Sequence, residues 1–320
     1  MAHLKRRQFG KLAAASFTST ILVDFSSQVL AKTITPSQEI TYGVKIGSAS
    51  KARNKEDQAP ALDLNIADMK TKKFLAKTNV ADQSVDNPLP VAKKSRAFFL
   101  ADSDRVTKVV MLGEGNLVIS TVSHTRHGCF NHLISTVGGA NNPRFKAKKI
   151  LGLESATQTV ESLLHLPNNQ LLCLIGNEGI PPFSFKTIDL KTGKILSGDE
   201  LNLPPLPPNH RFANLCLDSK GTIFATEIGS EGVPILIWMN LQDKAIITGK
   251  VKINRLTPLS FEGRPLLNDV KDLAFSPSGQ LYALASINEG KNNALFTVDM
   301  KTGKMLLAGD FEGEKFTFFS

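Results

Sequence analysis

The amino-acid sequence predicts an all-β fold, a β-propeller of five blades in which each blade is a four-stranded antiparallel sheet. The first observation is a pattern of apolar strand, tight polar turn and apolar strand that occurs four times, with turn positions 54, 52 and 58 residues apart at Gly115, Asn169, Gly221 and Gly279. The second is that each pattern is followed by another strand pair. Four short strands repeated about every 50–60 residues are typical of a propeller blade. A ring of such units buries the faces that a single unit leaves exposed.

The predicted strand pairs divide the chain into five modules. Gly and Asn at the turn positions supply the positive φ that a tight hairpin turn needs. The first pairs are residues 108–122, 162–175, 214–228 and 272–286. The second pairs are residues 185–198 and 296–309, with looser relatives at 64–77 and 234–249. The modules therefore cover residues 40–80, 105–150, 158–202, 212–255 and 270–312.

The first module lacks an innermost strand of its own, and the C-terminal residues offer one. Residues 315–320 (KFTFFS) alternate polar and aromatic side chains, which is the pattern of a half-buried strand. If this strand joins the first module, it closes the ring and covers an exposed sheet edge. The propeller domain is then residues 32–320. The alternative is a six-bladed ring in which residues 81–104 form a degenerate blade around residues 96–101, and the sequence favours five.

The N-terminus has the order of parts found in an export signal. Lys5, Arg6, Arg7, Phe9 and Lys11 precede a moderately apolar stretch over residues 12–23, and small residues near Ala31 suit a signal peptidase. This segment resembles a twin-arginine signal peptide over residues 1–31, with Gly10 where Leu is commoner in that family. The resemblance implies export of the folded protein to the periplasm or another extracytoplasmic compartment. The alternative is a basic amphipathic helix that belongs to the fold.

Composition and charge exclude several classes of protein. The chain is 42% hydrophobic and 21% charged, with a formal net charge of +9, which is ordinary globular composition. Outside the predicted signal, no apolar run reaches the length of a transmembrane helix, about 18 residues or more. No block of basic residues interleaved with aromatics suggests a nucleic-acid groove. We therefore expect no nucleic-acid partner and no transmembrane segment after signal removal.

Short motifs in the repeats resemble those of known propellers. The D-x-K-T-G-K hairpins at residues 189–194 and 299–304 resemble those of quinoprotein-like propellers. Residues 268–279 (NDVKDLAFSPSG) resemble NHL-type and gluconolactonase-type repeats. The resemblance implies a propeller fold, and the gluconolactonase family implies Glu, Asn and Asp ligands for a metal at the mouth of the central channel.

Structurally equivalent positions in the modules suggest a first candidate site. The first position of each predicted innermost strand is polar, and the four residues are Lys108, Ser162, Asn214 and Asp272. Asn214 and Asp272 offer oxygen ligands, but calcium takes six to eight oxygens, and the ammonium of Lys108 would oppose a divalent cation. The alternative is that these side chains face channel water. A ligand at this mouth would contact Lys108, Asn214 and Asp272.

Turns on the predicted rim of the same face repeat an x-Glu-Gly sequence. The three copies are residues 177–179, 230–232 and 288–290. We interpret them as solvated turns in which Gly takes the left-handed conformation. The alternative is a ring of three carboxylates that holds a cation.

The corresponding residues of the second module, 123–132, form a predicted loop with three of the six histidines in the chain. Imidazole and thiolate are the preferred ligands of zinc and copper, so candidate metal ligands, together with Asp272, are His124, His127, Cys129 and His132. Arg126 and His127 could instead clamp an anionic group. The alternative is a polar loop with one partly buried histidine and an inert cysteine.

No complete catalytic motif is present in the sequence. Gly-x-Ser-x-Gly, a Walker loop, His-Glu-x-x-His and Cys-x-x-Cys are all missing. Cys173 and Cys216 lie in apolar runs and could pair only if adjacent in space. We expect a non-enzymatic extracytoplasmic binding or scaffold propeller that uses one face for a protein or small-molecule partner. The alternative is a metal-dependent, lactonase-like hydrolase with a divalent cofactor at the channel mouth, and a quinoprotein-like redox module is a weaker third possibility.

Overall fold

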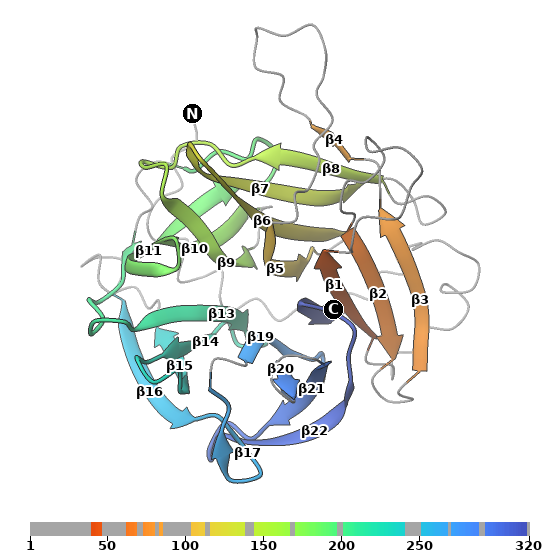
Figure 1. The fold of residues 1–320 in the computed structure, drawn as a ribbon, viewed down its shortest axis with the longest axis vertical. Helices are drawn as coiled ribbons and strands as arrows, with labels where there is room; N and C mark the ends of the chain where they lie inside the picture. The colour runs from red at the N-terminus through yellow and green to blue at the C-terminus, as the bar shows by residue number, and fades with distance from the viewer. Residues whose placement is uncertain are drawn as a thin grey trace, which may run out of the picture.

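Five sheets arranged around a central axis make up the computed structural model (Figure 1). It describes residues 40–46, 62–68, 73–80, 83–85, 104–112, 116–137, 144–166, 170–196, 201–240, 251–267, 270–287 and 292–318. Every regular element within these residues is a β-strand. The described part of the chain has no helix with the length and apolar character needed to cross a membrane. The predicted five-bladed propeller of four-stranded antiparallel sheets is confirmed. The predicted signal peptide and the region 86–103 of the six-bladed alternative lie outside the described residues. The same holds for the predicted turn positions Gly115 and Asn169 and for the x-Glu-Gly copy at 288–290.

The first blade combines the two ends of the described chain. It contains β1 (Ile40–Ile46), β2 (Leu62–Asp68) and β3 (Lys73–Val80), and its innermost strand is β23 (Lys315–Phe318). Antiparallel pairing places Thr41 opposite Phe318 and Val44 opposite Lys315. The C terminus consequently lies near the middle of the ring (Figure 1).

The other four blades are continuous in sequence, and their strands lie within or close to the predicted modules. Blade 2 contains β5 (Arg105–Met111), β6 (Leu117–Thr125), β7 (Gly128–Val137) and β8 (Arg144–Lys149), with β4 (Gln83–Val85) at its edge. Blade 3 contains β9 (Gln158–Leu166), β10 (Gln170–Asn177), β11 (Ile180–Asp189) and β12 (Leu201–Asn202). Blade 4 contains β13 (Arg211–Leu217), β14 (Ile223–Ile228), β15 (Pro234–Asn240) and β16 (Lys252–Pro258). Blade 5 contains β19 (Val270–Phe275), β20 (Leu281–Ile287), β21 (Asn292–Val298) and β22 (Lys304–Asp310), with β17 (Ser260–Phe261) and β18 (Arg264–Pro265) at its edge.

The two D-x-K-T-G-K motifs form turns that dock onto the preceding blade. At residues 299–304 the motif joins β21 to β22, and the Thr302 carbonyl accepts a hydrogen bond from Thr257 Oγ1 on β16 of blade 4 at 3.1 Å. At residues 189–194 the Gly193 carbonyl accepts one from Leu151 N at 2.9 Å. The predicted strand pair 185–198 is found in part. Ile195 pairs antiparallel with Ile188, and Leu196 N donates to the Thr187 carbonyl at 2.8 Å. Leu151 also pairs with Lys194, and the short β12 then adds to β11 as the last strand of blade 3.

Each of the four innermost strands that begin a blade carries a β-bulge near its start. The register shifts between Val106 and Lys108 in β5, and between Val270 and Asp272 in β19. Corresponding shifts occur at residues 160–162 of β9 and 213–216 of β13. A bulge re-aims the side chains beside it. These bulges fall at the positions that the sequence repeats made equivalent.

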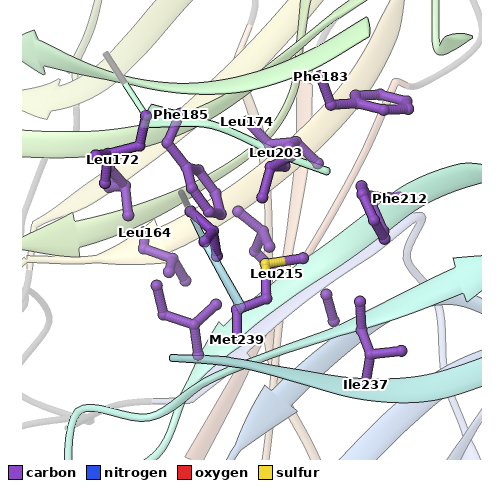
Figure 2. Packing of buried hydrophobic residues seen from close by; sticks show 14 residues of the cluster. Leu164, Leu172, Leu174, Phe183, Phe185, Leu203, Phe212, Leu215, Ile237 and Met239 are labelled. Carbon is purple, nitrogen blue, oxygen red and sulfur yellow. The ribbon is translucent and has the colours of Figure 1, made fainter. Parts of the chain in front are cut away.

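Apolar side chains fill the space between neighbouring blades. The cluster between blades 3 and 4 joins side chains of β9, β10 and β11 to side chains of β13, β14 and β15, as Figure 2 shows for Leu172, Phe185, Phe212 and Met239. Similar clusters join blade 1 to blade 2, blade 2 to 3, blade 4 to 5 and blade 5 to 1. The core is therefore a ring of interfaces, which explains why no single blade could be stable alone.

Replacement of Gly303 with Ala will destabilise the protein more than replacement of Gly279. Both glycines have positive φ, 70° and 85°, so both variants carry the cost of a left-handed alanine, about 1–2 kcal/mol. A Cβ on Gly303 would lie 2.0 Å from the Pro258 carbonyl oxygen, whereas a Cβ on Gly279 meets nothing within 4 Å. We expect the clash to add about 1–3 kcal/mol to the loss for G303A. Urea unfolding of both variants measures the difference, and equal losses would show that the turn does not dock on blade 4.

Candidate functional site

The expected channel-mouth residues are buried and form hydrogen bonds to neighbouring blades, and two of them, Lys108 and Asp272, bond to each other. The Lys108 ammonium on β5 lies 2.5 Å from Asp272 Oδ1 on β19 and also donates to the Leu273 carbonyl at 2.7 Å. Asp272 Oδ1 accepts from Leu273 N, and its Oδ2 accepts from Phe316 N on β23 at 3.0 Å. The exposed fractions of the two charged side chains are 4% and 0%. One carboxylate therefore connects blades 1, 2 and 5.

The other two equivalent residues make contacts of the same kind. Ser162 Oγ on β9 accepts from Leu215 N on β13 at 3.1 Å. Asn214, at φ 59° in the bulge of β13, donates to the Val270 carbonyl on β19 at 3.1 Å. The Lys315 ammonium of β23 reaches Asn214 Oδ1 at 3.4 Å. Sequence reasoning had assigned Lys315 only to the closing strand, because its contact with Asn214 depends on ring closure.

This arrangement suits structural closure better than a divalent cation. Both Asp272 oxygens accept hydrogen bonds, and Asn214 Oδ1 accepts from an ammonium group. Burial lowers the pKa of Lys315 to about 8, with Asp272 acting against this shift and Lys108 adding to it. Two lysines close to these oxygens oppose a metal ion.

The prediction of a loop over residues 123–132 is wrong, because most of these residues belong to two paired strands. β6 continues to Thr125 and β7 begins at Gly128, so only Arg126 and His127 form the turn. Both of these side chains are exposed. The strands extend because cross-strand pairing continues to the tip, where Thr125 lies opposite Gly128.

Register then divides the candidate metal ligands between two faces of the sheet. His124 lies directly opposite Cys129, so their side chains share a face. His132 has the opposite parity to Cys129 on β7 and lies on the other face. Burial, with a contribution from Lys149, lowers the pKa of His132 to about 4. The structure therefore brings together His124 and Cys129, and it separates them from His132 and Asp272.

Glu178 completes a three-residue cluster with this pair. Cys129 Sγ lies 3.4 Å from His124 Nδ1 and 3.4 Å from Glu178 Oε1. Partial burial, followed by the hydrogen bond and charge of Glu178, raises the pKa of the Cys129 thiol to about 11. Glu178 belongs to the β10–β11 turn of blade 3, where it and Gly179 have φ of 53° and 83°. The x-Glu-Gly copy at residues 177–179 thus forms the expected tight turn.

Two buried glutamates that sequence reasoning did not assign to a site hold arginines on the face where the innermost strands begin. Arg105 pairs with Glu161 at 3.0 Å and has a side chain 42% exposed. Arg255 pairs with Glu227 at 2.8 Å and has a side chain 52% exposed, and His210 Nδ1 lies 3.1 Å from the same glutamate. The sequence carried one weak signal, a Glu inside an apolar strand at Glu227, but the partners come from other strands.

The three cysteines are free thiols. Cys173 and Cys216 are buried in different apolar clusters, between blades 2 and 3 and between blades 4 and 5. Burial raises the pKa of both thiols. These two cysteines therefore act as small apolar side chains.

Comparisons with known proteins add little to this geometry. No family profile and no curated relative matches the chain. A solved protein of unknown function from Bacteroides caccae shares 11% identity at a TM-score of 0.48, over 88% of this chain and 99% of that one. Regucalcin from Agrobacterium tumefaciens, described as a calcium-binding protein, shares 12% identity at a TM-score of 0.41, over 84% of this chain and 77% of that one. A protein from Lactobacillus plantarum shares 15% identity at a TM-score of 0.38, over 86% of this chain and 67% of that one. Likeness at this level carries no functional argument.

Replacement of Asp272 with Asn will destabilise the fold strongly. The variant leaves the Lys108 ammonium buried without a counter-charge, which costs about 3–5 kcal/mol. Adding Lys108→Met to D272N should recover part of this loss, since the pair couples by about 0.5–3 kcal/mol. The matched control is E312Q, because Glu312 pairs with Lys45 on the surface and such pairs contribute about 0–1 kcal/mol. Equal unfolding free energies for D272N and E312Q would contradict the buried ion pair.

Alkylation by iodoacetamide will detect the raised pKa of Cys129. Because the thiolate reacts, a pKa of about 11 makes the reaction slow at pH 8, with a rate that rises about tenfold per pH unit below that pKa. Glu178→Gln removes the charge that raises this pKa, so the rate at pH 8 should increase several-fold. E231Q, on the equivalent turn of blade 4, serves as the control with an unchanged rate. A slower reaction in E178Q would refute the assigned contact.

Proposed function

We propose that this protein is an exported ligand-binding propeller that catalyses no reaction at its central channel. Its ligand is a small anion that binds on the face where the innermost strands begin. Export rests on the twin-arginine-like segment with Arg6 and Arg7. The absence of catalysis at the channel rests on the Lys108–Asp272 pair, which commits the acidic group at the axis to an internal contact.

Two arginine–glutamate ion pairs on the rim are the reason for proposing an anionic ligand. Arg105 and Arg255 are each fixed by a buried glutamate and remain about half exposed. A guanidinium has five N–H donors, and the bond from Arg105 to Glu161 uses Nη2. A fixed guanidinium binds a carboxylate or phosphate with little loss of side-chain freedom.

Long-range charge supports the same class of ligand. Without the predicted signal, residues 1–31, the chain has 34 basic and 28 acidic side chains, a formal net charge of +6. The exposed β6–β7 turn adds Arg126 and His127 on this face. A positive surface raises the local concentration of small anions. A protein partner with an acidic patch would use the same groups and is the alternative ligand.

The lactonase-like alternative rests on the resemblance of residues 268–279 to gluconolactonase-type repeats. In that family, oxygen ligands at the channel mouth hold a metal, and the matching positions here would be Asn214 and Asp272. The two lysines that hydrogen bond to these oxygens weigh against it. A metal would have to displace Lys108 and Lys315.

Calorimetric titration of the purified chain with citrate and inorganic phosphate, in chelator-containing buffer, tests the anion proposal. We expect binding that weakens as salt rises and that falls at least threefold in Arg255→Lys, since lysine lacks the planar fork. Arg126→Ala should also weaken binding. The control is R264A, which removes an exposed arginine on β18 at the outer edge of blade 5.

Two results would overturn the proposal. Absence of binding by every carboxylate and phosphate compound at low salt would refute the anionic ligand. Calcium-dependent hydrolysis of a lactone, lost in folded D272N, would instead establish the hydrolase. The two measurements are independent of one another.

A further inference from the structure

The cluster formed by His124, Cys129 and Glu178 lies at the seam between blades 2 and 3. One ligand atom from each side chain lies within 4.8 Å of the other two. His124 and Cys129 come from the paired strands of one hairpin, and Glu178 comes from the β10–β11 turn of the next blade. Ring geometry, and not a local sequence motif, creates this cluster.

The separations fit a tetrahedral metal centre. Zinc binds sulfur at about 2.3 Å and imidazole nitrogen or carboxylate oxygen at about 2.0–2.2 Å, so tetrahedral ligand atoms lie about 3.3–3.6 Å apart. Cys129 Sγ lies 3.4 Å from both His124 Nδ1 and Glu178 Oε1. Small side-chain rotations would bring His124 and Glu178 to the same separation.

The backbone that carries the ligands is fixed by one connecting segment. Cys129 N donates to the Ala156 carbonyl at 2.7 Å, and Glu178 N donates to the Thr157 carbonyl at 3.1 Å. On the other side, Thr125 Oγ1 donates to the Gly128 carbonyl at 2.9 Å, which braces the hairpin tip. Ligand positions held in this way reduce the ordering cost of metal binding.

The donor set selects the class of metal. Thiolate and imidazole favour zinc and other late first-row metals, whereas calcium and magnesium take oxygen ligands alone. His124 and Glu178 are exposed and Cys129 is partly buried, so an ion could enter from solvent. Three protein ligands leave the fourth position for water or an exogenous group.

We propose that His124, Cys129 and Glu178 bind one zinc-type transition-metal ion across the seam of blades 2 and 3. The ion replaces the thiol proton of Cys129, which is released to solvent. It links blade 2 to blade 3 outside the central channel. This inference stands apart from the anion proposal, whose test is carried out in chelator.

Cobalt(II) titration of the full chain tests the site directly. We expect one equivalent of cobalt with a thiolate-to-cobalt charge-transfer band, displaced by one equivalent of zinc in competition. C129S should abolish the band, and E178Q should weaken cobalt affinity at least tenfold. H127A is the matched control, because His127 is exposed on the same hairpin turn and lies outside the cluster, so its affinity should equal that of the parent chain.

Thermal unfolding distinguishes the loss of a metal ligand from the loss of the fold in each variant. Without metal, the variants C129S, E178Q and H127A should unfold at closely similar temperatures, since these side chains are partly or fully exposed. Zinc should raise the unfolding temperature of the parent and H127A but not of C129S. Cobalt binding without a thiolate band, or equal affinity in C129S and H127A, would overturn the proposal.

Discussion

The buried ion pair between Lys108 and Asp272 is the interaction on which the closed ring depends. Asp272 accepts hydrogen bonds from Lys108 in blade 2, from its neighbour Leu273 in blade 5 and from Phe316 N in blade 1. Charges this deeply buried are tolerated only when they are paired and hydrogen bonded. The pair consequently specifies where the last strand must lie. Ser162 and Asn214 add weaker contacts of the same type, so every blade is tied to the axis as well as to its neighbours through apolar interfaces.

One recurring backbone feature, a β-bulge, produces these contacts at the axis. Bulges near the starts of β5, β9, β13 and β19 turn equivalent side chains toward the axis or toward the adjacent blade. Because the axial polar groups satisfy one another, they have little capacity left for a ligand. The proposed function therefore places recognition at the rim, where hairpin turns differ from blade to blade and where a rigid scaffold holds them in place.

The rim groups share a design in which a buried carboxylate fixes an exposed partner. Glu161 holds Arg105, and Glu227 holds Arg255 and His210. Glu178 differs, since it is exposed and contacts a thiol instead of a guanidinium. Because of that difference, the proposed metal site lies at the seam of blades 2 and 3, and the proposed anion site uses the arginines. The two proposed activities therefore use separate side chains on one face.

Local patterns in the sequence determined the blades, whereas the candidate sites were decided by tertiary contacts. Turn glycines such as Gly221 and Gly279 and alternating apolar residues are short-range signals, because strand period and positive φ depend on neighbours in the chain. They predicted the five blades and most of the strand pairs, with the pair at residues 185–198 found in part and the predicted loop at 123–132 replaced by a hairpin. Because His132 and Cys129 are three residues apart on one strand, their alternation could have placed them on opposite faces of the sheet once the hairpin register was known. No local pattern could join Glu178 to Cys129 or Lys108 to Asp272, which are 49 and 164 residues apart. Those contacts depend on bulges, on ring closure by β23 and on the angle between blades, and only the folded ring defines these.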